Sequence, residues 1–174
     1  KQRNKMKIPK QCKIEKAVSK DKCREAMMNV LIDTKDTQAK AIATNGKILA
    51  IVPIETDATD KLGGERLINK KTIIEARKQG GIISLNGAAV LQNGEVYPVR
   101  DDLNFPNWRK VIPDEQKETY TSVRFDAKLL FELAQAIGAE NHVVTLRIPG
   151  TPRQPLVIDE PKTGGKGILM PVRM

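Results

Sequence analysis

The sequence predicts an α+β fold in which antiparallel sheets carry helices on one face, arranged as about three repeated modules. Two amphipathic segments, 69–79 and 126–137, are each followed by short apolar segments typical of strands. Tight hairpins are predicted between these segments, because both residues of an Asn-Gly pair tolerate positive φ. Such pairs occur at 45–46, 86–87 and 93–94.

The first run of strands is predicted in residues 24–55, where the stretch from Met27 to Ile32 is apolar enough for a strand. A polar turn, DTKDTQ, follows it. AKAIAT and KILAIVPIE then flank Asn45-Gly46 and predict a hairpin. No convincing helix precedes this run, so the first module is expected to lack its helix.

Each later module is predicted as a strand, a short helix and three strands. Asn69 is a suitable N-cap for the first helix, and Gly80-Gly81 ends it. Asp126 and Gly138 have the same roles around the second helix. Its apolar side chains fall on one face at Leu129, Leu130, Leu133, Ala134 and Ile137. HVVTLRI, PLVID and GILMPVR are the strands expected after it.

The composition indicates a globular chain with an uneven charge. The 174 residues are 40% hydrophobic, and no window approaches the 18 consecutive apolar residues of a membrane span. No signal peptide is predicted, since the basic N-terminus lacks an apolar core. Cys12 and Cys23 lack zinc-site spacing and are interpreted as free thiols of a cytoplasmic protein.

The net charge of +9 lies almost entirely near the N-terminus, where residues 1–24 hold ten basic and two acidic residues. Residues 1–23 are therefore expected to form a basic arm. Such an arm either contacts phosphates, through Lys5, Lys7 and Lys10, or is a solvated tail that only aids solubility. The chain starts with Lys rather than Met, which leaves room for an upstream segment.

Three stretches, in the same order, resemble motifs of the bacterial DNA sliding clamps, the beta subunit of DNA polymerase III. ATNGKILAIVPIE (43–55) is similar to the clamp hairpin ATDGHRLA, and NFPNWRKVIP (104–113) to the connector FPDYRRVLP. GILMPVRM, at the C-terminus, is similar to VMPMRL. The resemblance implies a middle-domain-like region over 24–113 and half of a C-terminal-domain-like module over 114–174. Nothing matches the first domain of the family.

The resemblance implies a DNA-replication function without catalysis or a cofactor. Family members are rings of several domains that encircle duplex DNA and tether polymerases. Partner proteins dock a short peptide into a cleft between the middle and last domains. The matching positions here are Thr44, Gly46, Lys47, Ile48, Leu49, Pro106, Lys110, Val111, Ile168, Leu169, Met170, Pro171, Val172, Arg173 and Met174. Lys47 and Ile48 replace the family's His and Arg, so partner preference is expected to differ.

DNA contacts in the family come from helices that line the ring. The helix expected at 69–79 carries Lys70, Lys71, Arg77 and Lys78, which are candidate phosphate contacts. The alternative is an ordinary solvated helix face. DNA would be bound as a duplex, independently of its sequence.

The sequence is compatible with three functions. The first is a sliding-clamp-like processivity factor that forms a ring-shaped homo-oligomer. The second is a clamp-like binding module that forms no ring and recruits or competes for clamp-binding proteins, for instance in a mobile element. The third, an enzyme, has little support. Its candidates are His142, Asp33 with Asp36, Asp101-Asp102 and Gly164-Gly165-Lys166, none in a metal-site or phosphate-loop context.

Overall fold

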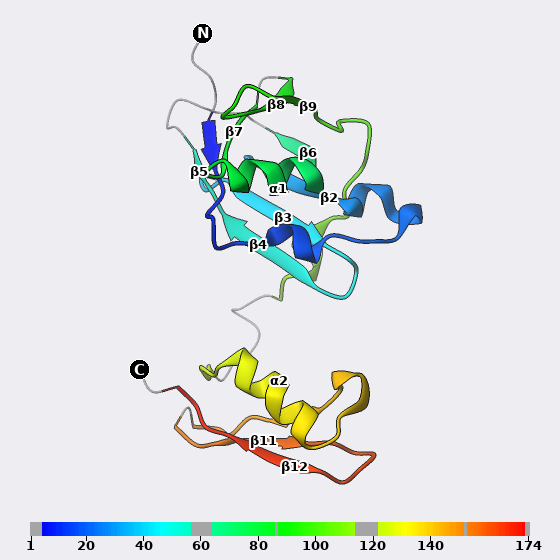
Figure 1. The fold of residues 1–174 in the computed structure, drawn as a ribbon, viewed down its shortest axis with the longest axis vertical. Helices are drawn as coiled ribbons and strands as arrows, with labels where there is room; N and C mark the ends of the chain where they lie inside the picture. Colours follow the sequence, from blue (N-terminus) through cyan, green and yellow to red (C-terminus); the bar gives the residue numbers. More distant parts are fainter. Residues whose placement is uncertain (1–4, 57–63, 86, 114–121, 152, 173–174) are drawn as a thin grey trace. The chain divides into compact units, whose positions relative to one another are not determined.

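The computed structural model describes residues 5–56, 64–85, 87–113, 122–151 and 153–172. The chain divides into two compact units, Lys1–Ile112 and Pro113–Met174, called here the first and second units. The division falls within one residue of the 113/114 boundary expected from the sequence. Figure 1 shows the strands and helices of each unit.

The first unit contains two antiparallel sheets. In one sheet the order is β4-β3-β2-β6, and in the other it is β5-β1-β7-β8-β9. The strands of the first sheet are β2 (Asn29–Asp33), β3 (Lys40–Thr44), β4 (Leu49–Pro53) and β6 (Glu65–Asn69). Those of the second are β1 (Lys5–Lys7), β5 (Glu55–Thr56), β7 (Ile82–Leu85), β8 (Ala88–Leu91) and β9 (Val96–Pro98).

The α-helix of the first unit, α1 (Lys70–Lys78), begins at Asn69, whose side chain accepts a hydrogen bond from the Lys71 backbone N–H at 2.9 Å. Ile73 and Ala76 turn one face of α1 into the core, where each is 1% exposed. The glycines after it take positive φ, as predicted for the helix end. The predicted cap and stop of this helix are therefore confirmed.

Two modules make up the first unit. The first module runs from β1 to β4, and the second from β6 through α1 to β9. Between β1 and β2 lie only two 3₁₀ helices, η1 (Ile14–Ala17) and η2 (Lys22–Met28), so the expected lack of an α-helix in the first module is confirmed. Each module gives its first strand to the other module's sheet: β1 pairs with β7, and β6 pairs with β2.

The expectation of a free basic arm over 1–23 is corrected by the packing of its described part. Met6, Ile8, Ile14 and Val18 are each at most 5% exposed and belong to the largest apolar cluster of the first unit. The lysines on either side of Met6 point to solvent because side chains alternate along a strand. The positive charge is therefore carried on the outer side of a folded segment.

The second unit is one further module, called here the third module: residues 122–126, α2 (Ala127–Ala136), and the sheet β10-β11-β12. The strands are β10 (Thr145–Arg147), β11 (Leu156–Asp159) and β12 (Lys166–Leu169). A short helix, η4 (Glu140–His142), lies between α2 and β10, and another, η3 (Trp108–Val111), lies in the first unit. Asp126 caps α2 as predicted, through the Lys128 backbone N–H at 2.8 Å. In Figure 1, α2 lies across one face of the sheet.

Two predicted strands in the second unit are shorter in the structure. HVVTLRI gives only Thr145–Arg147, since η4 covers its first residue, where His142 takes a φ of 59°. GILMPVR gives a strand that ends at Leu169, before Pro171 removes a donor from the ladder. The α+β class with antiparallel sheets and helices on one face is otherwise confirmed.

Candidate functional site

The β3–β4 turn is fixed by the side chains that the Asn-Gly hairpin provides. Asn45 Oδ1 accepts hydrogen bonds from the backbone N–H groups of Lys47 and Ile48, at 2.9 and 3.1 Å. Thr44 Oγ1 donates to the Ile48 carbonyl at 2.7 Å and accepts from the Gly46 N–H. Gly46 has a φ of 86°, which only glycine adopts without strain. The turn therefore presents Lys47 and Ile48 to solvent in a defined conformation.

The connector packs on the first unit through η3. Trp108 is 5% exposed and lies against Leu31, Ile42 and Leu67, on the face of the β4-β3-β2-β6 sheet that points away from the main core. A 3₁₀ turn brings Trp108 and Val111 to the same side of the segment, because residues i and i+3 eclipse in that helix. Packing of one aromatic ring thus fixes the direction of the residues after it.

Arg109 holds the connector in place electrostatically. Its guanidinium lies 4.4 Å above the Trp108 ring and 2.7 Å from the carboxylate of Asp33, a side chain that is 1% exposed. Burial lowers the pKa of Arg109, but the hydrogen bonds and charges of Asp33 and Asp36 outweigh burial and raise it. The guanidinium therefore stays charged and joins the connector to the end of β2.

The hairpin and the connector line one pocket of about 290 Å³ in the first unit. Seven of the eight cleft residues predicted in these two stretches border it, and Lys110 does not. Sequence reasoning missed three further lining residues. One of them, Trp108, could have been predicted, because it is the only tryptophan of the chain and lies at the centre of the connector motif. The lining residues are Met27, Thr44, Gly46, Lys47, Ile48, Leu49, Pro106, Asn107, Trp108 and Val111.

The pocket combines an apolar wall with a cation at its rim. Ile48 and Val111 are 53% and 68% exposed, although exposed large aliphatic side chains are unfavourable in water. None of the described residues that line it is acidic, and Lys47 is exposed. A surface of this kind is suited to an apolar side chain from another molecule, with a negative group beside Lys47.

The predicted C-terminal wall lies in the second unit. Ile168, Met170 and Val172 are each more than half exposed, whereas Leu169 is buried in the core of the unit. The Val172 N–H donates to the Arg124 carbonyl at 2.8 Å, so the chain after β12 stays attached to the module. The last two predicted residues, Arg173 and Met174, lie outside the described part of the chain.

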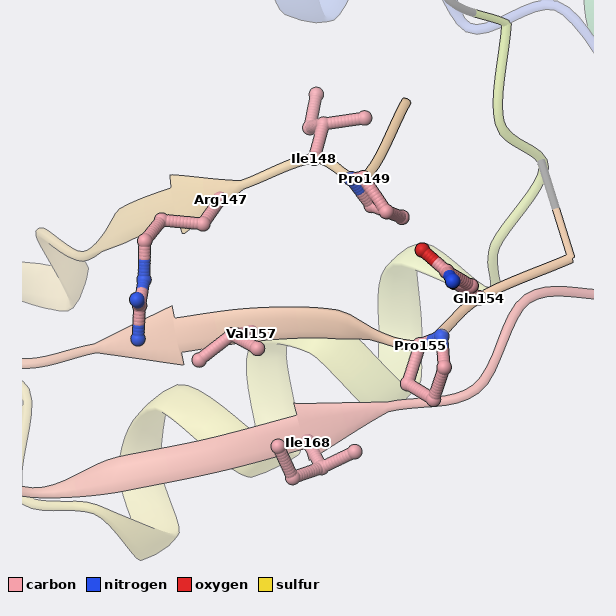
Figure 2. Close-up of a pocket in the computed structure, with 7 residues that line it drawn as sticks. All are labelled: Arg147, Ile148, Pro149, Gln154, Pro155, Val157 and Ile168. Carbon is pink, nitrogen blue, oxygen red and sulfur yellow. The ribbon is translucent and has the colours of Figure 1, made fainter. Parts of the chain in front are cut away.

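A second hollow, of about 460 Å³, lies on the open face of the β10-β11-β12 sheet. Figure 2 shows Val157 of β11 and Ile168 of β12 side by side on that face, below Ile148. Arg147 borders the hollow, and its guanidinium contacts the Asp159 carboxylate at 2.7 Å. The sequence predicted only Ile168 as a site residue here.

The candidate DNA contacts differ in their availability. Arg77 is the least accessible of them: its guanidinium lies 2.6 Å from the Glu15 carboxylate, and the two side chains are 19% and 9% exposed. Lys71 is exposed and Lys70 half-buried at the start of α1, while Lys78 contacts a carboxylate within its own helix. Lys5, Lys7 and Lys10 are exposed on the outer side of the N-terminal segment.

His142, Asp33 and Gly164, three of the candidates for catalysis, lie in contacts or turns of the fold. His142 is exposed and its ring packs on Phe131, with centroids 4.8 Å apart. Asp33 belongs to the Arg109 ion pair, and Gly164 forms the turn between two strands. Across the described ranges, no three His, Cys, Asp or Glu side chains are placed to hold a metal ion together. None of the helices there is long and apolar enough to cross a membrane.

Comparison with known proteins identifies the fold. No protein-family model and no curated protein matches the chain by sequence. Solved structures of bacterial beta sliding clamps do match. The C. crescentus clamp is 17% identical, with a TM-score of 0.62 over 100% of this chain and 66% of the clamp. The Bacillus subtilis clamp is 15% identical, with a TM-score of 0.59 over 98% and 49%.

The Helicobacter pylori beta clamp, solved with a DNA ligase peptide bound, is 14% identical, with a TM-score of 0.54 over 99% of this chain and 66% of the clamp. This chain thus has the fold of the bacterial sliding clamps and spans between half and two thirds of their length. The sliding-clamp fold expected from the sequence resemblance is confirmed.

Proposed function

We propose that this protein is a sliding-clamp-like processivity factor. It tethers DNA polymerase, or other replication and repair proteins, to duplex DNA through a cleft for their clamp-binding peptides. The observation that supports the proposal best is the pocket in the first unit, where residues 44–49 and 106–111 lie together. The role is one of binding, with no reaction and no cofactor.

The pocket would bind the apolar anchor of such a peptide. Ile48 and Val111 supply aliphatic surface, Trp108 forms part of the wall, and Met27 adapts to the shape of the ligand. Burying one large apolar side chain against these residues contributes about 1.5–3 kcal/mol. Lys47 would favour a peptide with an acidic residue near the anchor.

The C-terminal residues of the second unit would also contact such a peptide. Ile168, Met170 and Val172 already expose apolar surface in the second unit. Pro171, Leu169, Arg173 and Met174 complete the stretch that matches the family motif. Removal of residues 170–174 is expected to weaken peptide binding without unfolding the first unit.

DNA would be held without sequence preference, by lysines that contact phosphates. The exposed Lys5, Lys7, Lys10 and Lys71 are the best candidates, with Lys70 and Lys78 beside them. Several copies of the chain would assemble around the duplex, as a homo-oligomer in the cytoplasm. Retention on nicked circular DNA, with loss after linearisation, tests the ring. Equal loss from both forms would instead favour the clamp-like module that binds peptides without a ring.

Peptide binding can be tested with the full chain and a labelled copy of the DNA ligase peptide seen on the Helicobacter pylori clamp. Val111→Asp places a charge in the pocket at a side chain that is 68% exposed, so folding is not at risk. Val96→Asp makes the same change at 65% exposure, away from the pocket. We expect Val111→Asp to weaken binding at least about tenfold and Val96→Asp to have no effect.

The intrinsic fluorescence of the protein provides a second readout. Trp108 is the single tryptophan of the chain and lines the pocket, so an occupied pocket should change its emission. Absence of any binding by the wild-type chain would refute the peptide cleft. Equal binding by both valine variants would place the peptide elsewhere on the protein.

A further inference from the structure

The second unit holds one copy of a module of which the first unit holds two. In the first unit, neither module is complete alone, because the first strand of each belongs to the sheet of the other. The helix α1 also packs against β2 and η1 of the first module, in addition to β6 and β7 of its own. A single module therefore leaves a strand edge and part of a helix uncovered.

The third module follows the order of the second module: an extended entry segment or strand, an α-helix and three strands. In the second module, the Arg100 N–H donates to the Leu67 carbonyl of β6 at 3.0 Å, just after β9. In the third module, the Val172 N–H donates to the Arg124 carbonyl at 2.8 Å, just after β12. Residues 122–126 thus take the place of β6, and β10 takes the place of β7.

In the first unit, strands of the first module pair with β6 and β7. Within the described residues of the second unit, no strand pairs with the corresponding edges. There β7 pairs with β1 over residues 82–84, whereas β10 pairs only with β11 in the described part of the chain. Within the same ranges, residues 122–126 likewise lack the partner that β2 gives to β6. Only residues 114–121 separate the third module from the connector, which is too few for a further module. An unpaired edge of this kind is a template for a strand from another chain.

The surface next to the open edge is apolar. Thr72, in the first turn of α1, is 1% exposed, while Leu129 in the first turn of α2 is 49% exposed and Phe131 is 46% exposed. Leu146 of β10 is 37% exposed, although it lies opposite the fully buried Ile158 and so faces the same side as α2. Of the large apolar side chains exposed in the described residues, eight lie in the second unit and five in the longer first unit.

The exposed area is sufficient for a sizeable part of a stable interface. Leu129, Phe131, Val143 and Leu146 together expose roughly 350 Å², at about 150–200 Å² for each fully exposed side chain. A stable complex buries about 800 Å² on each partner. Strand pairing along β10 and residues 122–126 would contribute the remainder.

We propose that the second unit binds the second unit of another copy of this chain in a two-fold dimer. Residues 122–126 of each copy pair with β10 of the other copy, as β6 pairs with β2 and β1 with β7 in the first unit. The position that η1 has beside α1 is filled by the partner's α2, which covers Leu129. The contact is self-complementary, so two copies close it and the edges that it uses are no longer open to a third copy.

The dimer can be tested on the full chain by light scattering over a micromolar concentration series. We expect the wild-type mass to be twice the 19.3 kDa of the chain, or an even multiple of it. Leu129→Glu should raise the dissociation constant at least about tenfold and leave folding intact, because this side chain is half exposed. Val96→Glu, in the first unit, is the matched control and should leave the mass unchanged.

Hydrogen exchange supplies a second measurement. Amides of β10 should exchange more slowly in the wild-type chain than in Leu129→Glu, at equal concentration. A monomeric wild-type chain, an odd-numbered assembly, or an unchanged mass in Leu129→Glu would overturn the inference. The pocket lies in the first unit, so failure of peptide binding with dimers present would refute the proposed cleft and leave the dimer standing.

Discussion

Replacement of Gly81 by alanine tests whether the basic N-terminal segment is part of the folded first unit. The Ile8 N–H donates to the Gly81 carbonyl at 3.0 Å, and a Cβ at position 81 would lie 2.3 Å from the Ile8 carbonyl oxygen. Contacts under 3.0 Å between backbone and Cβ do not persist, so β1 would have to move. Gly81→Ala should therefore displace Met6 and Ile8 from the core.

The magnitude follows from two effects that a control variant separates. Gly81 has a φ of 84°, where an L-residue costs about 1–2 kcal/mol. Gly94 has a φ of 89°, and a Cβ added there would meet nothing within 4 Å, so Gly94→Ala carries the conformational cost alone. Overpacking adds about 1–3 kcal/mol at position 81. We expect the unfolding free energy of Gly81→Ala to be lower than that of Gly94→Ala by this overpacking cost alone.

Urea unfolding followed by tryptophan fluorescence is the assay. Trp108 lies in the first unit and is the only tryptophan of the chain. Its fluorescence therefore reports the unfolding of the first unit and not that of the second. Equal unfolding free energies for the two variants, within about 0.5 kcal/mol, would show that residues 5–8 do not pack against Gly81. The segment would then be a free arm, as its lysine content suggests.

Three further outcomes are expected. Arg109→Met leaves the buried Asp33 without its cation and should lower the unfolding free energy of the first unit by about 1–2 kcal/mol in a urea titration. Glu15→Gln should cost about 1–3 kcal/mol in the same assay, because the largely buried Arg77 guanidinium loses its charged hydrogen-bond partner. A backbone hydrogen bond from the turn before β12 lowers the pKa of Glu160, so the carboxylate stabilises the second unit above its unfolded pKa. This contribution disappears as the pH falls through the folded pKa, and Glu160→Gln should flatten the acid side of a thermal-stability profile.

Local features of the fold could be read from the sequence because each depends on a few neighbouring residues. Asn69 and Asp126 cap the two α-helices by bonds to the N–H two residues on. The hairpin at Asn45-Gly46 forms because its own side chains and a positive φ complete it. The pocket residues of the hairpin and connector were predicted from motif resemblance. A motif identifies residue positions in the sequence but does not show which residues they contact.

The N-terminal strand was hidden by its short length and its charges. Lys5, Met6, Lys7 and Ile8 alternate between exposed and buried, the period of a half-buried strand. Four residues are too few to distinguish that period from a lysine-rich tail. Only the pairing of β1 with β7 decided that Met6 and Ile8 enter the core.

The sequence by itself determined the type of module, the caps and turns within it, and the two motifs that border the pocket. The tertiary structure alone decided which strand joins which sheet, that Trp108 and Arg109 hold the connector on β2, and that Arg77 faces Glu15. These contacts join residues far apart in the chain, and their free energy comes from burial and ion pairing that exist only once the modules pack together. The open edge of the third module was also visible only in the tertiary structure. The local sequence of that module predicts its helix and strands, but only the strand pairing shows that β10 lacks a second neighbour within the described residues.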